Sequence, residues 1–90
     1  MRIMKHAKIP NIKITAVNPN CDGSLSIDRK LLEHYDILPD EQIHVLGVTK
    51  KDRAITYAME GKAGEVCCNG GLANIFEVGD VVNIVAYEMI

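Results

Sequence analysis

The sequence contains no tryptophan, one phenylalanine and three tyrosines among its 90 residues. Proteins that bind single-stranded nucleic acids stack bases on aromatic side chains, so this scarcity argues against such a role. The formal net charge of −2 also offers no basic surface for phosphate groups. We therefore expect an aliphatic core and no nucleic-acid partner.

Long apolar runs are absent as well. The first ten residues, MRIMKHAKIP, are interrupted by Lys5, His6 and Lys8, so they lack the apolar stretch of a signal peptide. No segment has the length that spanning a bilayer requires. These absences predict a cytoplasmic protein with no membrane contact.

Cysteine is scarce, and its spacing does not suggest a metal site. Cys21, Cys67 and Cys68 are an odd number without the spacing of a disulfide framework, which favours a reducing compartment. Neither CxxC nor HxxxH spacing occurs, so a zinc-type ligand set is not expected. We predict that no metal binds and that the thiols are buried or inert.

The composition that remains is that of a single globular domain over residues 1–90, with 48% hydrophobic and 24% charged residues. A chain of this length buries a limited fraction of its surface, so contacts between subunits are expected to add stability.

Short segments with the alternation of strands dominate the chain. Strands are predicted over residues 1–8, 12–17, 24–27, 42–48, 53–59, 65–68 and 81–87. Asp28 is a good N-cap for a short helix over residues 29–35, and one helical turn is expected within residues 69–80. Many short strands with little helix predict an all-β fold, a compact β-barrel that leaves no exposed sheet edges.

The segment 53–59 separates its side chains onto two faces by the period of a strand. One face would carry Arg53, Ile55, Tyr57 and Met59, and the other Ala54, Thr56 and Ala58. Long polar side chains on one face can converge on a ligand.

The stretch NPNCDGSLSID, residues 18–28, contains the pair Gly23 and Ser24. Because glycine has no Cβ, the peptide before Ser24 can adopt a strained turn that other residues would refuse. The serine hydroxyl could then attack the Gly23 carbonyl and break the chain. Both residues also favour ordinary turns, so the pair alone is a weak signal.

Several motifs together resemble the pyruvoyl-dependent aspartate decarboxylases, a bacterial enzyme family. These motifs are MRIMKHAKI, DGSLSID, RAITYAM, the Asn69 and Gly70 pair, and GDVVNIVAY. The resemblance covers nearly the whole chain. It implies a six-stranded double-psi β-barrel, assembled as a homotetramer with active sites between neighbouring subunits.

The same resemblance implies cleavage between Gly23 and Ser24, which converts Ser24 into a pyruvoyl group. This self-derived cofactor would serve the decarboxylation of L-aspartate to β-alanine and CO2 for pantothenate and coenzyme A synthesis. The family pattern makes Tyr57 the proton donor and places Thr56 in support of cleavage and substrate binding.

The substrate carboxylates need cations, which Lys8 and Arg53 can supply. By resemblance, Asn69 supports cleavage, and the backbone N–H groups of Gly70, Gly71 and Leu72 help to hold the substrate. Taken alone, such a lysine or arginine is usually a solvated surface charge.

The sequence departs from the family pattern at several points. Pro10 replaces a histidine, Cys21 replaces a tyrosine near the cleavage pair, and NGGLAN replaces an NGAA-type turn. The loop between Tyr57 and Asn69 is shorter than usual, and the chain stops at Ile90, before the tail of most members. These departures bear on the efficiency of cleavage and on substrate choice.

Two other interpretations remain open. The chain could be an uncleaved, inactive paralogue that keeps the barrel. Residues 24–48 also resemble swapped-hairpin transition regulators, which bind DNA as dimers through a basic face. The basic residues here are scattered along the chain, which counts against DNA binding.

Overall fold

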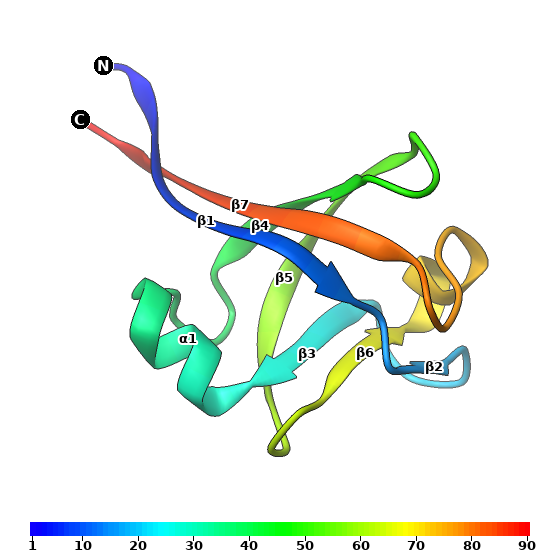
Figure 1. Cartoon of the computed structure of the whole chain (residues 1–90). Helices are drawn as coiled ribbons and strands as arrows, with labels where there is room; N and C mark the ends of the chain where they lie inside the picture. The colour runs from blue at the N-terminus through cyan, green and yellow to red at the C-terminus, as the bar shows by residue number, and fades with distance from the viewer.

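The computed structural model describes residues 1–90, most of which lie in strands (Figure 1). In chain order the elements are β1 (Ile3–Lys13), β2 (Ala16–Asn18), β3 (Ser24–Asp28), α1 (Arg29–Tyr35), β4 (Gln42–Gly47), β5 (Arg53–Gly61), β6 (Val66–Asn69), the 3-10 helix η1 (Gly70–Asn74) and β7 (Val81–Met89). Neither helix has the length and apolar character that crossing a membrane requires.

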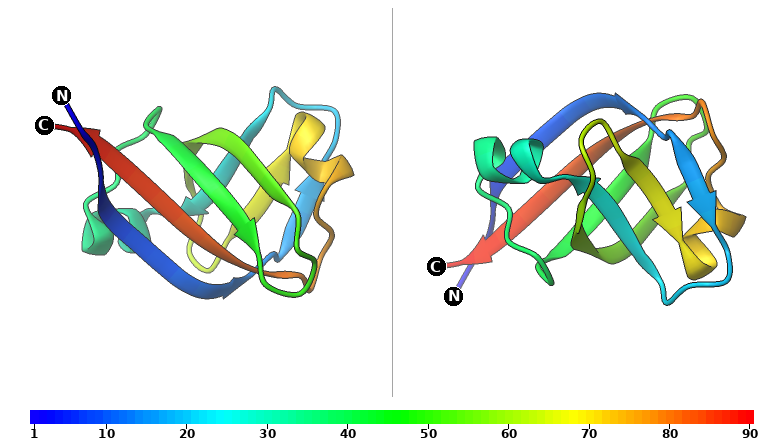
Figure 2. Two further views of the ribbon diagram at one scale, coloured as in Figure 1. Left: turned by 90° about the horizontal axis from the view of Figure 1, so that it is seen from above. Right: turned by 90° about the horizontal axis from the view of Figure 1, so that it is seen from below.

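The strands form one mixed sheet in the order β1-β7-β4-β5-β3-β6-β2. The pairs β3/β5 and β2/β6 are parallel, and the other neighbours are antiparallel. The sheet curls around its interior, so that the fold resembles a barrel (Figure 2). The predicted all-β fold with one short α-helix is confirmed. The sheet has seven strands, which is the number of strand-like segments in the sequence and one more than the resemblance implies.

The core is aliphatic, as the sequence predicts, and Phe76 is the one aromatic side chain in it. Its largest fully buried members include Ile9, Ile14, Leu25, Ile27, Ile43, Val45, Val82 and Ile84. Burying one such side chain stabilises the fold by about 1.5–3 kcal/mol. These residues alternate with outward-facing ones along their strands, which fixes the register of the sheet.

The predicted strand over residues 12–17 is wrong, because the chain changes partners within it. β1 continues to Lys13 along β7, and β2 begins at Ala16 beside β6. Between them, the Ile14 N–H donates to the Asp80 carbonyl at 2.9 Å and the Thr15 N–H donates to the Val66 carbonyl at 2.8 Å. The alternation of apolar and polar residues continues through this point, but the strand to which the chain is hydrogen-bonded changes from β7 to β6.

Pro10 lies at an irregularity of β1, where the register with β7 shifts between Ile9 and Ile12. Proline has no N–H for a strand ladder, so a bulge is a position that accepts it. The next residue, Asn11, has φ of 53° and donates its N–H to Asn83 Oδ1 at 2.8 Å.

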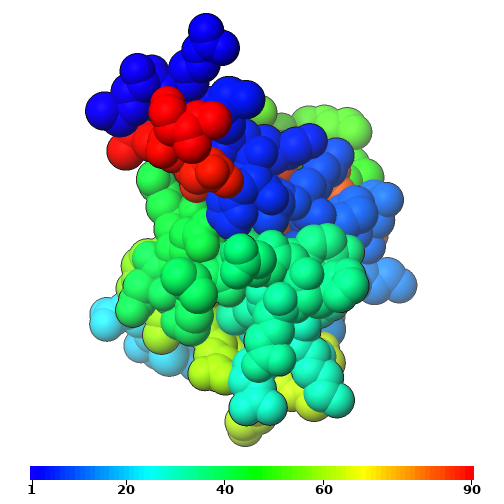
Figure 3. Space-filling view, turned by 90° about the vertical axis from the view of Figure 1, so that its left-hand side faces the viewer, coloured from blue at the N-terminus to red at the C-terminus, as the bar shows by residue number.

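Helix α1 has the predicted bounds and the predicted cap. Asp28 Oδ1 accepts the Lys30 N–H at 2.8 Å, and Asp36, with φ of 56°, ends the helix. Figure 3 shows α1 and the turn after it on one face, below the paired ends of β1 and β7. Those ends are joined by hydrogen bonds between Arg2 and Ile90.

Candidate active site

The structure brings the predicted nucleophile, Ser24, into contact with Asn69. The two residues lie opposite each other on the antiparallel strands β3 and β6. The Asn69 Nδ2 group donates to Ser24 Oγ at 2.9 Å. Both side chains are buried, with exposed fractions of 5% for Ser24 and 8% for Asn69. A polar pair sheltered from water in this way keeps a defined geometry.

Two residues that the sequence analysis missed complete this network. Asn69 Nδ2 also donates to Ser26 Oγ at 2.9 Å, and the Cys67 thiol donates to Asn69 Oδ1 at 3.4 Å. Burial raises the pKa of the Cys67 thiol, with smaller contributions from Glu65 and Cys21. The period of a strand could have identified both residues, because side chains two positions apart share one face. Ser26 follows Ser24 by two residues, and Cys67 precedes Asn69 by two.

The steric prediction for Gly23 is wrong, because the crowded glycine of this site is Gly70. The peptides are all trans, and Gly23 is not among the glycines with positive φ. A Cβ on Gly23 would meet nothing within 4 Å, whereas a Cβ on Gly70 would lie 2.6 Å from the Cys21 carbonyl oxygen and 2.7 Å from the Gly23 nitrogen. With φ of 60°, Gly70 lets the backbone after Asn69 pass close to the loop that carries Gly23.

Cys21 sits in that loop as an exposed thiol. Its Sγ accepts a hydrogen bond from Asn18 Nδ2 at 2.9 Å, and its N–H donates to the Asn18 carbonyl at 3.4 Å. These local bonds join the loop to the end of β2. The Cys21 side chain therefore interacts within its own loop.

Tyr57 lies at the level of Ser24 on the neighbouring strand. The parallel register pairs Leu25 with Ala58, so Ser24 and Tyr57 each lie one residue before that pair. Leu25 and Ala58 are fully buried, whereas Tyr57 is 37% exposed on the opposite face of β5. Since adjacent strands are about 4.8 Å apart, the register puts Tyr57 beside Ser24.

Thr56 takes the opposite face from Tyr57, as the alternation predicts, and is half-buried. Together with Asp40, Gln42 and Ile55, the two residues line a shallow depression of about 500 Å³. A small polar ligand could enter this depression from solvent.

Lys8 and Arg53 do not converge on Ser24 within one chain. Lys8 is exposed on β1, where it pairs with Val85, and β7 and β4 separate β1 from β5. Arg53 is exposed at the start of β5, four residues before Tyr57, or roughly 13 Å along a strand.

Gly70, Gly71 and Leu72 form the first turn of η1, immediately after Asn69. Leu72 is buried in the core, which anchors this turn. The first N–H groups of a helix lack partners within it, so this turn offers donors next to Asn69. No three histidine, cysteine, aspartate or glutamate side chains are grouped so that they could hold a metal ion.

Comparison with known proteins gives a consistent result. Residues 1–90 match the family model described as aspartate decarboxylase. The aspartate 1-decarboxylase of Thermoanaerobacter pseudethanolicus is 40% identical over 90 residues, which cover 98% of this chain and 77% of that protein. That of Microcystis aeruginosa is 40% identical over 88 residues, covering 98% of this chain and 63% of the relative. That of Desulfitobacterium hafniense is 43% identical over 88 residues, which cover 96% of this chain and 69% of that protein.

Proposed function

Because the chain belongs to the aspartate decarboxylase family, a family of carboxy-lyases, we propose that it converts L-aspartate into β-alanine and CO2. The family prediction made from the motifs is confirmed over the whole chain. The proposal extends this family assignment to the substrate of this protein and to a role in pantothenate and coenzyme A synthesis in the cytoplasm.

The proposal includes cleavage of the chain between Gly23 and Ser24. Ser24 Oγ attacks the Gly23 carbonyl carbon, the C–N bond breaks, and the nitrogen takes the hydroxyl proton, which leaves an ester. Elimination removes the Ser24 Cα hydrogen as a proton and releases the Gly23 carboxylate, which leaves a dehydroalanine. This tautomerises to an imine, and water hydrolyses the imine to a ketone with release of ammonia. The residue that was Ser24 becomes a pyruvoyl group at the start of the second chain.

The single observation that carries this proposal is the buried hydrogen bond from Asn69 to Ser24 Oγ. This donor leaves the hydroxyl proton free to transfer and stabilises the negative charge that develops on Oγ when the ester is eliminated as a carboxylate, and burial strengthens that effect. In the product, the carbonyl oxygen takes the place of the Ser24 nitrogen, and Cβ becomes a methyl group. That pyruvoyl carbonyl supplies the electron-withdrawing chemistry of the decarboxylation.

Tyr57 is proposed as the proton donor to the substrate carbon. The support is the register that places Tyr57 at the level of Ser24, with its side chain on the exposed face of β5. Thr56 would support cleavage and substrate binding from the rim of the depression that it shares with Tyr57. Tyr57→Phe should still undergo cleavage but release CO2 slowly; equal turnover in the two proteins would remove Tyr57 from this role.

Lys8 and Arg53 are proposed to bind the substrate carboxylates across subunits of a homotetramer. Both side chains are exposed, and neither reaches Ser24 within one chain. Ile55 and Met59, which flank Tyr57 on the face of Arg53, are exposed by 58% and 37%. This apolar surface supports a contact between subunits next to the site. Gly70, Gly71 and Leu72 would add backbone donors.

A second candidate function is that of an uncleaved paralogue, and the geometry of Gly23 favours it. Self-cleavage was predicted from a strained turn at Gly23, but that residue has neither a positive φ nor a crowded environment. The regulator interpretation loses its support, because the family match covers the residues on which it was based.

The intact mass of the purified protein distinguishes the two candidates. Cleavage gives fragments of residues 1–23 and 24–90, the second beginning with a pyruvoyl group, and Ser24→Ala stays full length. The cleaved protein should release CO2 from L-aspartate, whereas Ser24→Ala should not. A wild-type chain that stays full length after prolonged warming, with no CO2 released, would establish the paralogue instead.

A further inference from the structure

We propose that Cys67 and Ser26 are positioning residues that orient the Asn69 amide for cleavage at Ser24. The inference rests on the proposed self-cleavage and extends it to two residues to which the motif comparison gave no role. The Asn69 side chain forms three hydrogen bonds, one each with Cys67, Ser26 and Ser24.

An asparagine side chain can present two different faces to a neighbour. Its Nδ2 group donates two hydrogens, and its Oδ1 atom only accepts. With Nδ2 toward Ser24, the hydroxyl proton stays free to leave and the oxygen receives a donor. In the reversed orientation Oδ1 would hold the hydroxyl proton and would repel the negative charge that develops on Oγ when the ester is eliminated. The orientation of this amide therefore decides whether Asn69 helps or hinders cleavage.

Cys67 and Ser26 fix that orientation from two sides. The Cys67 thiol donates to Oδ1, and Ser26 Oγ accepts one Nδ2 hydrogen, which leaves the other for Ser24. The antiparallel register pairs Ser24 with Asn69 and Ser26 with Cys67, so all four side chains lie on one face of β3 and β6. Cys67 is 7% exposed and Asn69 is 8% exposed, so the hydrogen bond between them is largely shielded from solvent. Burial also raises the pKa of Cys67, so the thiol keeps the hydrogen that it donates.

Substitution of Cys67 separates a hydrogen-bonding role from a packing role. Cys67→Val fills a buried strand position without a donor, whereas Cys67→Ser restores a donor at the cost of a polar group. If Cys67 positions Asn69, Cys67→Val should slow cleavage about 2- to 10-fold, the value of one hydrogen bond, and Cys67→Ser should stay within about 2-fold of wild type. Faster cleavage in Cys67→Val than in Cys67→Ser would overturn the assignment.

Ser26 is tested with the same logic. Ser26→Ala should slow cleavage about 2- to 10-fold, and Ser26→Thr, which keeps the hydroxyl, should restore it. In an Asn69→Ala background, neither Ser26→Ala nor Cys67→Val should slow cleavage further, because both act through the missing amide. Additive losses in that background would show that the two residues act by another route.

A second measurement separates this inference from the proposed function. Ser24→Ala stays full length in either case and keeps the contacts of Asn69 with Cys67 and Ser26. In this background, Cys67→Val should speed hydrogen exchange of the Asn69 side-chain amide, as measured by NMR, and Cys67→Ser should not. An uncleaved wild-type chain would refute the proposed function, whereas equal exchange rates in all three proteins would refute the positioning role.

Discussion

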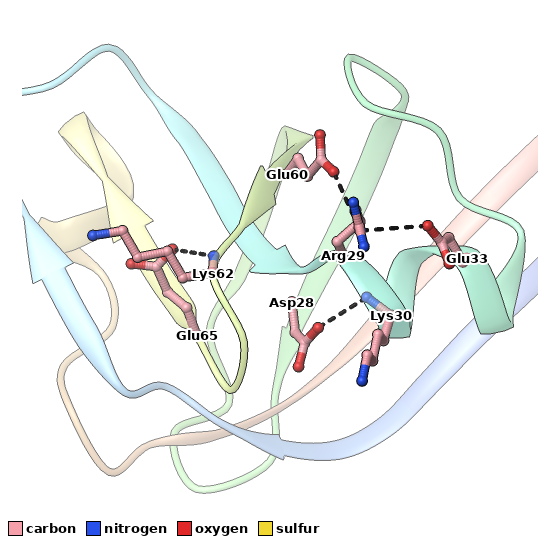
Figure 4. A network of polar contacts seen from close by, with 7 residues as sticks. All are labelled: Asp28, Arg29, Lys30, Glu33, Glu60, Lys62 and Glu65. Carbon is pink, nitrogen blue, oxygen red and sulfur yellow. Dashed lines mark hydrogen bonds and ion pairs between the residues drawn. The ribbon is translucent and has the colours of Figure 1, made fainter.

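The polar side chains at the two ends of β3 form their hydrogen bonds and ion pairs in different environments, buried at one end and exposed to solvent at the other. At its start, Ser24 lies in a buried, uncharged network centred on one amide. At its end, Asp28 accepts the Lys30 backbone N–H, and the neighbouring Arg29 forms exposed ion pairs with Glu33 and Glu60 (Figure 4). A buried hydrogen bond that loses one partner costs about 1–3 kcal/mol, whereas an exposed ion pair contributes about 0–1 kcal/mol. Burial therefore gives the Ser24 end one defined geometry.

A hollow in the surface lies at the Asp28 end of β3. The hollow has a volume of about 470 Å³ and is lined mostly by charged residues: Asp28, Arg29, Lys30, Glu60, Gly61, Lys62, Ala63 and Glu65. Arg29 Nε lies 3.7 Å from Glu60 Oε1 and 3.5 Å from Glu33 Oε1. The hollow lies between α1 and the β5–β6 turn.

The largest effect is expected from Asn69→Asp, which places a carboxylate in the buried network. It removes both N–H donors and opposes negative charge on Ser24 Oγ, so cleavage at neutral pH should slow by about 100-fold. The free energy of unfolding should also fall by about 1–3 kcal/mol, because Ser24 and Ser26 lose their donor. Intact-mass time courses and chemical denaturation measure the two effects.

Asp28→Asn provides the matched exchange at the other end of the strand. It replaces a carboxylate by an amide at a half-buried position outside the Ser24 network, so cleavage should proceed at the wild-type rate. If Asn69→Asp were cleaved as fast as Asp28→Asn, the buried network would have no part in the reaction.

The next effect is expected from Gly70→Ala. The added methyl would press against the Cys21 carbonyl oxygen at 2.6 Å, and alanine at φ of 60° is strained, so the variant should lose about 1–3 kcal/mol of stability. Gly23→Ala is the control, with an expected change below about 1 kcal/mol, because nothing lies within 4 Å of its added Cβ. Both are measured by denaturant unfolding in the full-length Ser24→Ala chain. Equal losses would mean that Gly23 is the constrained residue after all.

Local features of the fold could be predicted from the sequence. The Asp28 cap and helix α1 depend on residues within one turn, and the two faces of β5 follow from alternation alone. The break between β1 and β2 could not be predicted, because it is made by hydrogen bonds from Ile14 and Thr15 to distant partners.

The site was predictable only in part for the same reason. The family motifs identified Ser24 and Asn69, but the contributions of Ser26 and Cys67 depend on how β3 and β6 pair, about 40 residues apart in the chain. The closeness of Gly70 to Gly23 likewise depends on the tertiary fold. A steric argument made from the cleavage pair alone therefore assigned the constraint to the wrong glycine.

A smaller effect, confined to acid pH, is expected at Asp28. Hydrogen bonds from the Gly64 N–H and then the Lys30 N–H lower the pKa of Asp28 below 3.8, its ordinary value. The ionised carboxylate therefore adds stability above that value, and the contribution is lost as the pH falls through the lower folded pKa. The stability difference between wild type and Asp28→Asn should shrink as the pH falls from 5 to 2, measured by urea unfolding. A difference that does not vary with pH would remove the carboxylate from this role.

The smallest effect is expected from Arg29→Ala. Arg29 is 64% exposed in its pairs with Glu33 and Glu60, so losing them should cost less than about 0.5 kcal/mol. Alanine is also the better helix former, and a cation in the first turn opposes the helix dipole, so the net change should be near zero. Unfolding at low and high salt measures it, and the difference between the proteins should vanish at high salt. A loss above about 1 kcal/mol that persists in salt would mean that the exposed end of β3 is as tightly coupled as the buried one.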